Sequence, residues 1–150
     1  MSERHGAYIY ILVIKAENLL AADSNGFSDC FCDVYMDANT RRVKSTKVIN
    51  KTLNPNWNHR ISFHRPRHDA TSTATFTVFD ADWLGRDFLG SATVEVGKAP
   101  FGVVQDVCVE LGPMDGKSRG KLYLKISSGD SRETPDLNVY GSLSKSSFQS

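Results

Sequence analysis

Hydrophobic positions between residues 7 and 127 fall in short runs rich in β-branched and aromatic residues, and Gly, Pro, Asn and Asp interrupt these runs. The pattern predicts strands joined by turns, and no stretch of convincing length has the 3.6-residue period of a helix. We therefore expect an all-β fold, an eight-stranded antiparallel β-sandwich. The expected strands are 7–16, 29–36, 42–48, 57–64, 73–79, 88–96, 105–111 and 119–127.

The first and last of these segments differ in how their hydrophobic residues are distributed. The segment YIYILVI (8–14) is apolar throughout, as in a central strand covered on both faces, and it is too short to cross a bilayer. The segment KLYLKIS (121–127) alternates apolar and polar residues, which predicts one buried face. The following sequence is rich in Ser, Gly and other polar residues, so we expect a domain over 1–127 and a flexible tail or linker over 128–150.

Length and composition narrow the class of function. A chain of 150 residues suits one domain, and 18 basic against 17 acidic residues leave a net charge of +1. This balance gives no overall field for nucleic acid, so any electrostatic function must be local. The spacing of Cys30 and Cys32 is not that of a zinc site, and three cysteines fit a reduced, cytoplasmic chain. Because His59, His64 and His68 match no common catalytic or metal pattern, we expect surface histidines and no enzyme.

Carboxylates are concentrated in two expected loops, one after the first strand and one after the fifth. Two carboxylates 4 Å apart repel by about 4 kcal/mol at an effective dielectric near 20, so converging groups need a compensating interaction. For any single Asp, exposure to water or capping of a local turn is a sufficient explanation. If both loops lie at one end of the sandwich, their oxygens suit Ca²⁺. The residues are Asp23 and Asp29 in NLLAADSNGFSDCF (18–31), and Asp80, Asp82 and Asp87 in VFDADWLGRDFLG (78–90).

Other cation sites fit this pattern less well. Magnesium demands a tight octahedron that protein groups alone rarely provide. Asp80, Asp82 and Gly85 match positions one, three and six of an EF-hand loop. Position five is Leu84, however, and position twelve is Ser91 instead of Glu, and no helical pattern flanks the segment. Calcium in a loop site of a sandwich remains the favoured hypothesis.

Four segments, in this order, resemble the C2 domain family, a calcium- and phospholipid-binding β-sandwich module, and the resemblance covers residues 6–127. It implies the family's second topology, in which the first strand corresponds to the second strand of the other form. The segments are ILVIKAENLLAAD (11–23), SDCFCDVYM (28–36), KSTKVINKTLNPNW (44–57) and FTVFDADWLGRDFLG (76–90).

The resemblance also implies a calcium-ligand set, completed by main-chain carbonyls such as those of Ala22 and Ala81. Two features depart from the family pattern: Cys30 replaces a usual proline, and the third loop is one residue shorter between Asp82 and Asp87 than in many members. The implied Ca²⁺ ligands are Asp23, Asp29, Asp80, Asp82 and Asp87.

The function implied is calcium-dependent binding to anionic phospholipid membranes, by a cytoplasmic monomer recruited when calcium rises. Bound Ca²⁺ would neutralise the loop carboxylates, so that an anionic leaflet containing phosphatidylserine or phosphoinositides could approach. Trp83 and Leu84 in the third loop and Phe27 in the first are candidates for insertion at the interface. The alternative for Trp83 and Phe27 is packing against their own loops.

A basic segment, TRRVKSTKVINK (40–51), offers a second surface. C2 domains often use basic residues in this region for phosphoinositide head groups, whereas a charged, soluble edge strand is the alternative explanation. This segment could also bind a protein partner without calcium. Trp57, which follows the segment, is expected to lie in the core. The candidate anionic-lipid-binding residues are Arg41, Arg42, Lys44 and Lys47.

Overall fold

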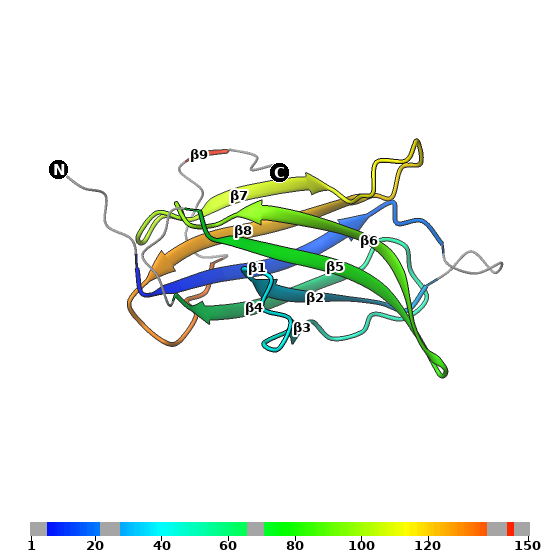
Figure 1. The fold of residues 1–150 in the computed structure, drawn as a ribbon, viewed down its shortest axis with the longest axis horizontal. Coiled ribbons are helices and arrows are strands. Elements are labelled where there is room, and N and C mark those ends of the chain that lie inside the picture. The colour runs from blue at the N-terminus through cyan, green and yellow to red at the C-terminus, as the bar shows by residue number, and fades with distance from the viewer. Residues whose placement is uncertain (1–5, 22–27, 66–70, 138–143, 146–150) are drawn as a thin grey trace.

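Two β-sheets face each other in the computed structural model, which describes residues 6–21, 28–65, 71–137 and 144–145 (Figure 1). One sheet has the strand order β4-β1-β8-β7-β9 and the other β3-β2-β5-β6. All pairings are antiparallel except β7 with β9. The predicted all-β sandwich is confirmed, and its assignment to the second C2 topology stays a prediction. The strands are β1 Tyr8–Glu17, β2 Cys30–Met36, β3 Lys44–Ser45, β4 Asn56–His64, β5 Thr73–Asp82, β6 Gly85–Glu95, β7 Gln105–Glu110, β8 Lys121–Gly129 and β9 Ser144–Lys145.

The third strand differs most from its prediction. We expected a strand over 42–48, but only Lys44–Ser45 forms a strand against β2. A side chain interrupts the ladder, because the Thr46 hydroxyl accepts the Cys32 N–H at 2.9 Å. The Thr46 N–H still donates to the Cys32 carbonyl at 2.9 Å, and further along the chain Ile49 bridges to Cys30. The basic segment is therefore mostly turn and irregular chain.

The space between the sheets holds the main hydrophobic core. Its members include Ile11 of β1, Phe76 of β5 and Leu124 of β8, all with almost no exposed surface. Trp57 is buried in the same cluster, as predicted, and its indole N–H donates to the Cys30 carbonyl at 3.1 Å. This bond fixes the start of β2, where the first acidic loop ends.

The outer face of β1 is covered as well. Tyr10 and Leu12 belong to a second buried cluster with Val104 and Leu137, which confirms that β1 is apolar on both faces because both are covered. The Tyr10 hydroxyl donates to the Ser131 carbonyl, which fixes the chain after β8 against this face. Part of the segment expected as a tail therefore contacts the sheet, and the flexibility of 128–150 stays a prediction.

Replacing Leu137 with Ala is expected to lower the free energy of unfolding by about 2–5 kcal/mol, because the side chain is fully buried and its removal leaves a cavity. Denaturant titration measures this difference. The matched control is Leu84→Ala, whose exposed side chain should change stability by less than about 0.5 kcal/mol. Equal, small effects of both variants would contradict a structural role for the chain after β8.

Several connections meet where β1 ends and β2 begins. The connections β3–β4, β5–β6 and β7–β8 lie toward the right-hand end of Figure 1, together with the end of β1 and the start of β2. Hydrogen bonds join residues next to β1 and β2 to the β3–β4 connection, because the Leu19 N–H donates to the Leu53 carbonyl and the Cys30 N–H to that of Ile49. Asp29, from the first sequence-predicted acidic loop, and the β5–β6 hairpin, from the second, both belong to this end. Within the described ranges, no helix is long and apolar enough to cross a membrane.

Candidate metal centre

Three neighbouring chain segments carry Asp29, Asp80 and Asp87. Cys30, the first residue of β2, pairs with Asp80 of β5, and Asp80 pairs with Asp87 of β6. Asp29 is held against β5 by two hydrogen bonds: its N–H donates to Asp80 Oδ1 at 2.8 Å, and its carbonyl accepts the Ala81 N–H at 2.7 Å. These three predicted ligands are therefore neighbours, although 58 positions separate the first from the last.

The pairing of Asp80 with Asp87 is electrostatically unfavourable. Residues directly opposite each other on antiparallel strands share a face, with Cβ atoms about 4.5–5.5 Å apart, and like charges there are destabilising. Asp80 is also buried, with only 4% of its surface exposed, so water screens its charge poorly. The Asp29 N–H donates to the Asp80 carboxylate and helps to stabilise it, and a cation between the strands would stabilise both carboxylates.

Asp82 lies at the end of β5, where the chain turns back into β6. Its partner across the hairpin is Gly85, and Asp82 Oδ1 accepts the Leu84 N–H at 2.8 Å. This local bond is the turn-capping role that a single Asp can have without any metal. Asp29 has a similar bond, since its Oδ1 accepts the Lys51 N–H at 2.8 Å. Each bond occupies one carboxylate oxygen and holds the side chain near the loop end.

The described side chains do not form a ready ion cage. Within the ranges that the structure describes, no three Asp, Glu, His or Cys side chains are grouped so as to hold a metal ion. Asp23, Ala22 and Phe27 lie outside the described residues. The structure thus places Asp29, Asp80 and Asp87 on adjacent segments without bringing their carboxylates into one coordination shell. Their role as ligands stays a prediction.

The chemistry of the neighbouring groups fits a hard cation. The Cys30 thiol is buried beside the acidic residues and donates to the Thr52 carbonyl at 3.3 Å. Burial, followed by the charges of Asp80 and Asp29, raises the pKa of this thiol to about 12. The thiol is therefore neutral at physiological pH and is a poor metal ligand. Carboxylate and carbonyl oxygens remain, which are ligands suited to Ca²⁺ and not to softer metals.

Arg86, which the sequence reasoning did not assign to the site, fastens the β5–β6 hairpin to β2. Its guanidinium forms an ion pair with Asp33 of β2 at 2.8 Å and lies 4.3 Å from the ring centroid of Phe79 on β5. Phe79 in turn stacks on Phe31 of β2, with 5.5 Å between ring centroids. The only signal in the sequence was a charged residue, Asp33, within the otherwise uncharged segment CFCDVYM (30–36). These contacts stabilise the position of the loop that carries Asp82.

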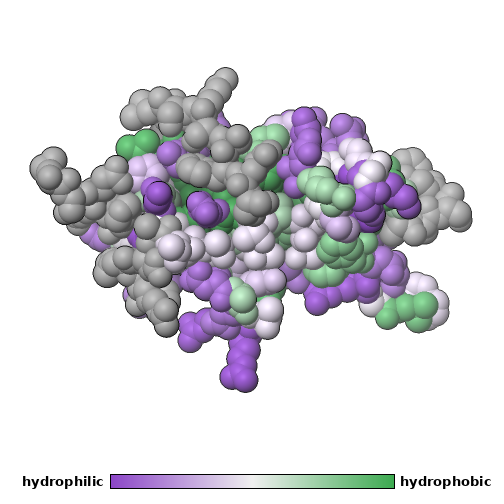
Figure 2. Space-filling model, turned by 45° about the horizontal axis from the view of Figure 1, so that its top comes forward, coloured by the Kyte–Doolittle hydropathy of each residue, from purple (hydrophilic) through white to green (hydrophobic). Residues whose placement is uncertain are grey.

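The tip of the hairpin consists of two exposed apolar side chains. Trp83 is 91% exposed and Leu84 79% exposed, so Trp83 does not pack against its own loop. Figure 2 shows hydrophobic surface on a projection at this end of the molecule. Two adjacent large apolar side chains that are exposed together on a projecting loop form a candidate contact for a membrane or a protein partner. Their insertion into a membrane stays a prediction.

Comparison with known proteins identifies the family. The model of the C2 domain family matches residues 7–111. The chain belongs to the C2 domain family. The resemblance seen in the sequence is thereby confirmed, together with the β-sandwich that it implied.

Individual C2-containing relatives are much longer than this chain. Rabphilin-1 of Caenorhabditis elegans is 41% identical over 90 residues, which are 57% of this chain and 8% of that protein. Mouse synaptotagmin-7 is 31% identical over 134 residues, 86% of this chain and 33% of that protein. A C2 domain of plant extended synaptotagmin 1 superposes with a TM-score of 0.76 at 24% identity, over 87% of this chain and 100% of that structure, which shows the fold alone. The chain thus spans between 8% and 33% of the length of these two curated relatives.

The basic segment of this C2 domain has two parts. Arg41 and Arg42 lie in the turn that follows β2, where the Arg42 N–H donates to the Asn39 carbonyl at 3.2 Å. Their side chains are exposed, together with those of Lys44 and Lys47. All four candidate lipid-binding residues are therefore at the surface, but they do not form one continuous strand.

Lys44 contacts β4, and the charge of Lys47 acts on a residue of the same strand. The Lys44 ammonium donates to the Ser62 carbonyl and lies 5.1 Å from the ring centroid of Phe63. Burial and, secondly, the charge of Lys47 lower the pKa of His59, which places Lys47 beside this β4 residue. Lys44 is thus already engaged in the fold, a contact that the sequence did not predict. Lys47 and Arg42 are better candidates for an external anion.

Proposed function

We propose that this C2 domain binds anionic phospholipid membranes in a calcium-dependent manner and acts as a membrane-targeting module. The observation that carries the proposal is the direct pairing of buried Asp80 with Asp87 at the base of a hairpin whose apolar tip is exposed. A cation offsets the repulsion at the base, and a membrane covers the tip. Binding, and not catalysis, is the activity that we propose.

In the proposed mechanism, Asp29, Asp80, Asp82 and Asp87 would hold calcium together with Asp23 of the first loop. Bound calcium would supply positive charge that attracts lipid phosphate oxygens. Without it, the negative end of the domain is repelled by an anionic leaflet. The carboxylates thereby make membrane approach conditional on calcium, which supports recruitment of a cytoplasmic protein when calcium rises.

The relatives support this proposal at the level of the family. A pair of C2 domains from extended synaptotagmin 2 has been solved in a calcium-bound form, which matches 85% of this chain with a TM-score of 0.64 and 23% identity; the match covers 47% of that structure. Human multiple C2 and transmembrane domain-containing protein 1 is 33% identical over 120 residues, 79% of this chain and 12% of that protein.

Co-sedimentation with phosphatidylserine vesicles, in calcium and then in excess chelator, tests the proposal. We expect the domain to pellet with vesicles in calcium and to stay in the supernatant with chelator or with vesicles of phosphatidylcholine alone. Binding that is identical in calcium and chelator would contradict the calcium switch. Binding to neither vesicle would favour a protein partner, the alternative for a C2 domain that does not bind lipid.

A second candidate function, calcium-independent binding of phosphoinositides, is favoured by the exposed cations along the β3–β4 side. Each Lys or Arg near an anionic surface contributes about 1 kcal/mol, which is roughly fivefold in affinity. Arg42→Ala and Lys47→Ala are each expected to weaken binding to phosphoinositide vesicles in chelator by about that factor.

Lys44→Ala should have a smaller effect on that binding, because the Lys44 ammonium is already bonded to Ser62. Vesicle titration in chelator measures all three variants, and Lys98→Ala serves as the control. Lys98 is exposed in the β6–β7 connection, at the opposite end of β6 from the hairpin. An effect of Lys98→Ala as large as that of Lys47→Ala would mean that no localised basic site exists.

A further inference from the structure

We propose that the β7–β8 connection, residues 111–120, is a second membrane-contacting element of this domain, and that it meets an anionic bilayer through Met114 and Lys117. The inference deepens the proposed membrane-binding function and rests on it. It adds a contact on the five-stranded sheet, whereas the hairpin tip and most of the acidic residues belong to the four-stranded sheet.

The fold places this connection at the end of the molecule that carries the acidic loops. Lys121, which begins β8, pairs with Glu17, which ends β1 immediately before the first acidic loop. Gly120 has a φ of 97°, and a Cβ there would lie 2.5 Å from the Glu17 carbonyl oxygen, so the connection lies directly against the end of β1. In Figure 1 this connection and the β5–β6 hairpin both project at the right-hand end. A membrane surface that approaches this end of the domain would therefore be near both loops.

The base of the connection is held firmly. Gly112 and Ser91 of β6 exchange two backbone hydrogen bonds, at 2.7 and 2.9 Å, which tie the connection to the other sheet. Arg119 donates to Asp115 at 2.7 Å and to the Leu89 carbonyl at 3.4 Å. The segment between these anchors is therefore presented in a defined place, and less entropy is lost when it binds.

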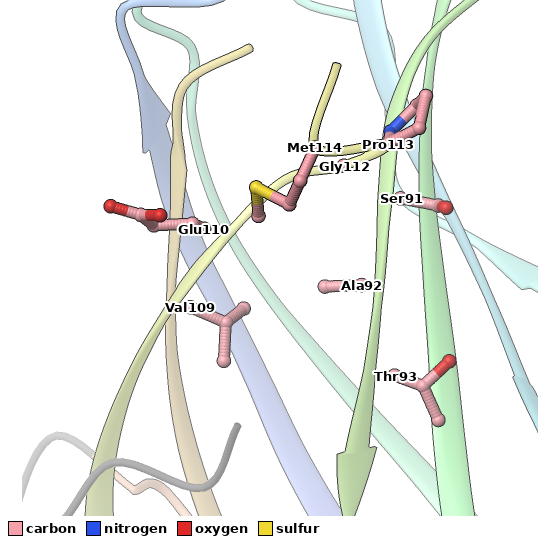
Figure 3. Close-up of a pocket in the computed structure, with 8 residues that line it drawn as sticks. All are labelled: Ser91, Ala92, Thr93, Val109, Glu110, Gly112, Pro113 and Met114. Atoms are coloured by element: carbon pink, nitrogen blue, oxygen red, sulfur yellow. The ribbon is translucent and has the colours of Figure 1, made fainter. Parts of the chain in front are cut away.

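The connection carries two exposed side chains that suit a membrane contact. Met114 is 69% exposed, and Figure 3 shows its side chain directed toward Glu110 beside a cavity of about 360 Å³ between β6 and β7 that Val109 and Ala92 also line. Its unbranched side chain has three rotatable bonds and adapts easily to a new apolar surrounding. Lys117 is exposed three positions further on.

The charges of the connection suit an anionic surface. Asp115, the only acidic residue among 111–120, is bonded to Arg119, and this bond lowers the pKa of Asp115, so the carboxylate stays ionised and paired. Lys117 then supplies the net positive charge of the connection. This charge attracts an anionic leaflet regardless of calcium, unlike the acidic residues of the same end. Two contacts on different sheets would also restrict rotation of the domain about a single insertion point.

Site-specific fluorescence tests the second contact. The protein would carry Cys108→Ser together with one of Met114→Cys, Leu84→Cys or Lys98→Cys, labelled with a polarity-sensitive dye, because Cys30 and Cys32 are buried and will not react. Phosphatidylserine vesicles with a quencher in the acyl region are then added in calcium. We expect quenching at positions 84 and 114 and none at position 98.

The outcomes separate this inference from the proposed function. Quenching at 84 without quenching at 114 would leave calcium-dependent membrane binding in place and would overturn the second contact. No quenching at either position, with no co-sedimentation, would overturn both. In unlabelled protein, Lys117→Ala should weaken vesicle binding about fivefold and Lys98→Ala less than about twofold. Equal effects would contradict a specific role for Lys117.

Discussion

Replacing Asp80 and Asp82 with Asn is expected to abolish calcium-dependent association with phosphatidylserine vesicles while the fold stays intact. Asn keeps an oxygen at the same place, so it can still accept the N–H groups of Asp29 and Leu84. The change therefore removes two negative charges and few hydrogen bonds. Loss of groups that only orient a metal ligand costs about 10–100-fold in affinity, so loss of two direct ligands should weaken calcium binding by more than about 100-fold.

Co-sedimentation measures the association, and thermal unfolding in chelator measures the fold. The thermal midpoint should be unchanged or slightly higher, because the repulsion between Asp80 and Asp87 is relieved. The matched control removes two charges elsewhere, with Glu95→Gln and Asp106→Asn. Glu95 ends β6 far from the hairpin, and Asp106 lies on β7, where it pairs with Lys125 at 3.3 Å. Unchanged association of the Asp80 and Asp82 double variant would overturn the proposed mechanism.

The local pattern of the sequence was sufficient to predict the sandwich and the content of its acidic loops. Alternation and turn residues predicted a strand over 73–79 and a loop with Asp80 and Asp82, because these signals act over a few neighbouring positions. In the structure β5 continues to Asp82 and β6 begins at Gly85, so the predicted loop is shorter and Asp80, Asp82 and Asp87 belong to strands.

Strand pairing was not predictable in the same way. Which residue faces Asp80 depends on the register of β5 with β6, and this register has a bulge between Val78 and Phe79. The direct pairing of Asp80 with Asp87 was therefore visible only in the structure.

Contacts between segments distant in the chain account for what the sequence reasoning missed. Arg86 and Asp33 are 53 positions apart, and Lys44 reaches Ser62 across the open edge between the sheets. Leu137 lies in a polar segment whose composition suggested no packing, and yet it is fully buried against β1. In each case the fold brings together two residues that are distant in the sequence. An average of composition over a local window cannot predict an individual contact of this kind.

Replacing Trp83 and Leu84 with Ala is expected to weaken membrane binding strongly without changing calcium binding in the absence of lipid. Complete burial of a large apolar side chain contributes about 1.5–3 kcal/mol, and partial burial of both at an interface should contribute about 2–3 kcal/mol together, or roughly 30- to 150-fold in affinity. Neither side chain is a proposed ligand, and Ala at position 84 retains the N–H that bonds to Asp82. The two functions of the hairpin, holding calcium and entering the membrane, are therefore separable.

Vesicle titration and calcium titration without lipid, performed on the same protein, distinguish these two effects. Intrinsic fluorescence gives an independent measure, because Trp57 is buried and an emission shift on adding vesicles in calcium must come mainly from Trp83. The control replaces two exposed apolar residues near β3, with Val43→Ala and Val48→Ala, and should leave vesicle binding within about twofold. If the control weakens binding as much as the hairpin variant, general hydrophobicity and not the tip drives association. Unaltered vesicle binding of the hairpin variant would mean that the exposed Trp83 and Leu84 are covered by something other than a bilayer, and a protein surface would become the leading candidate.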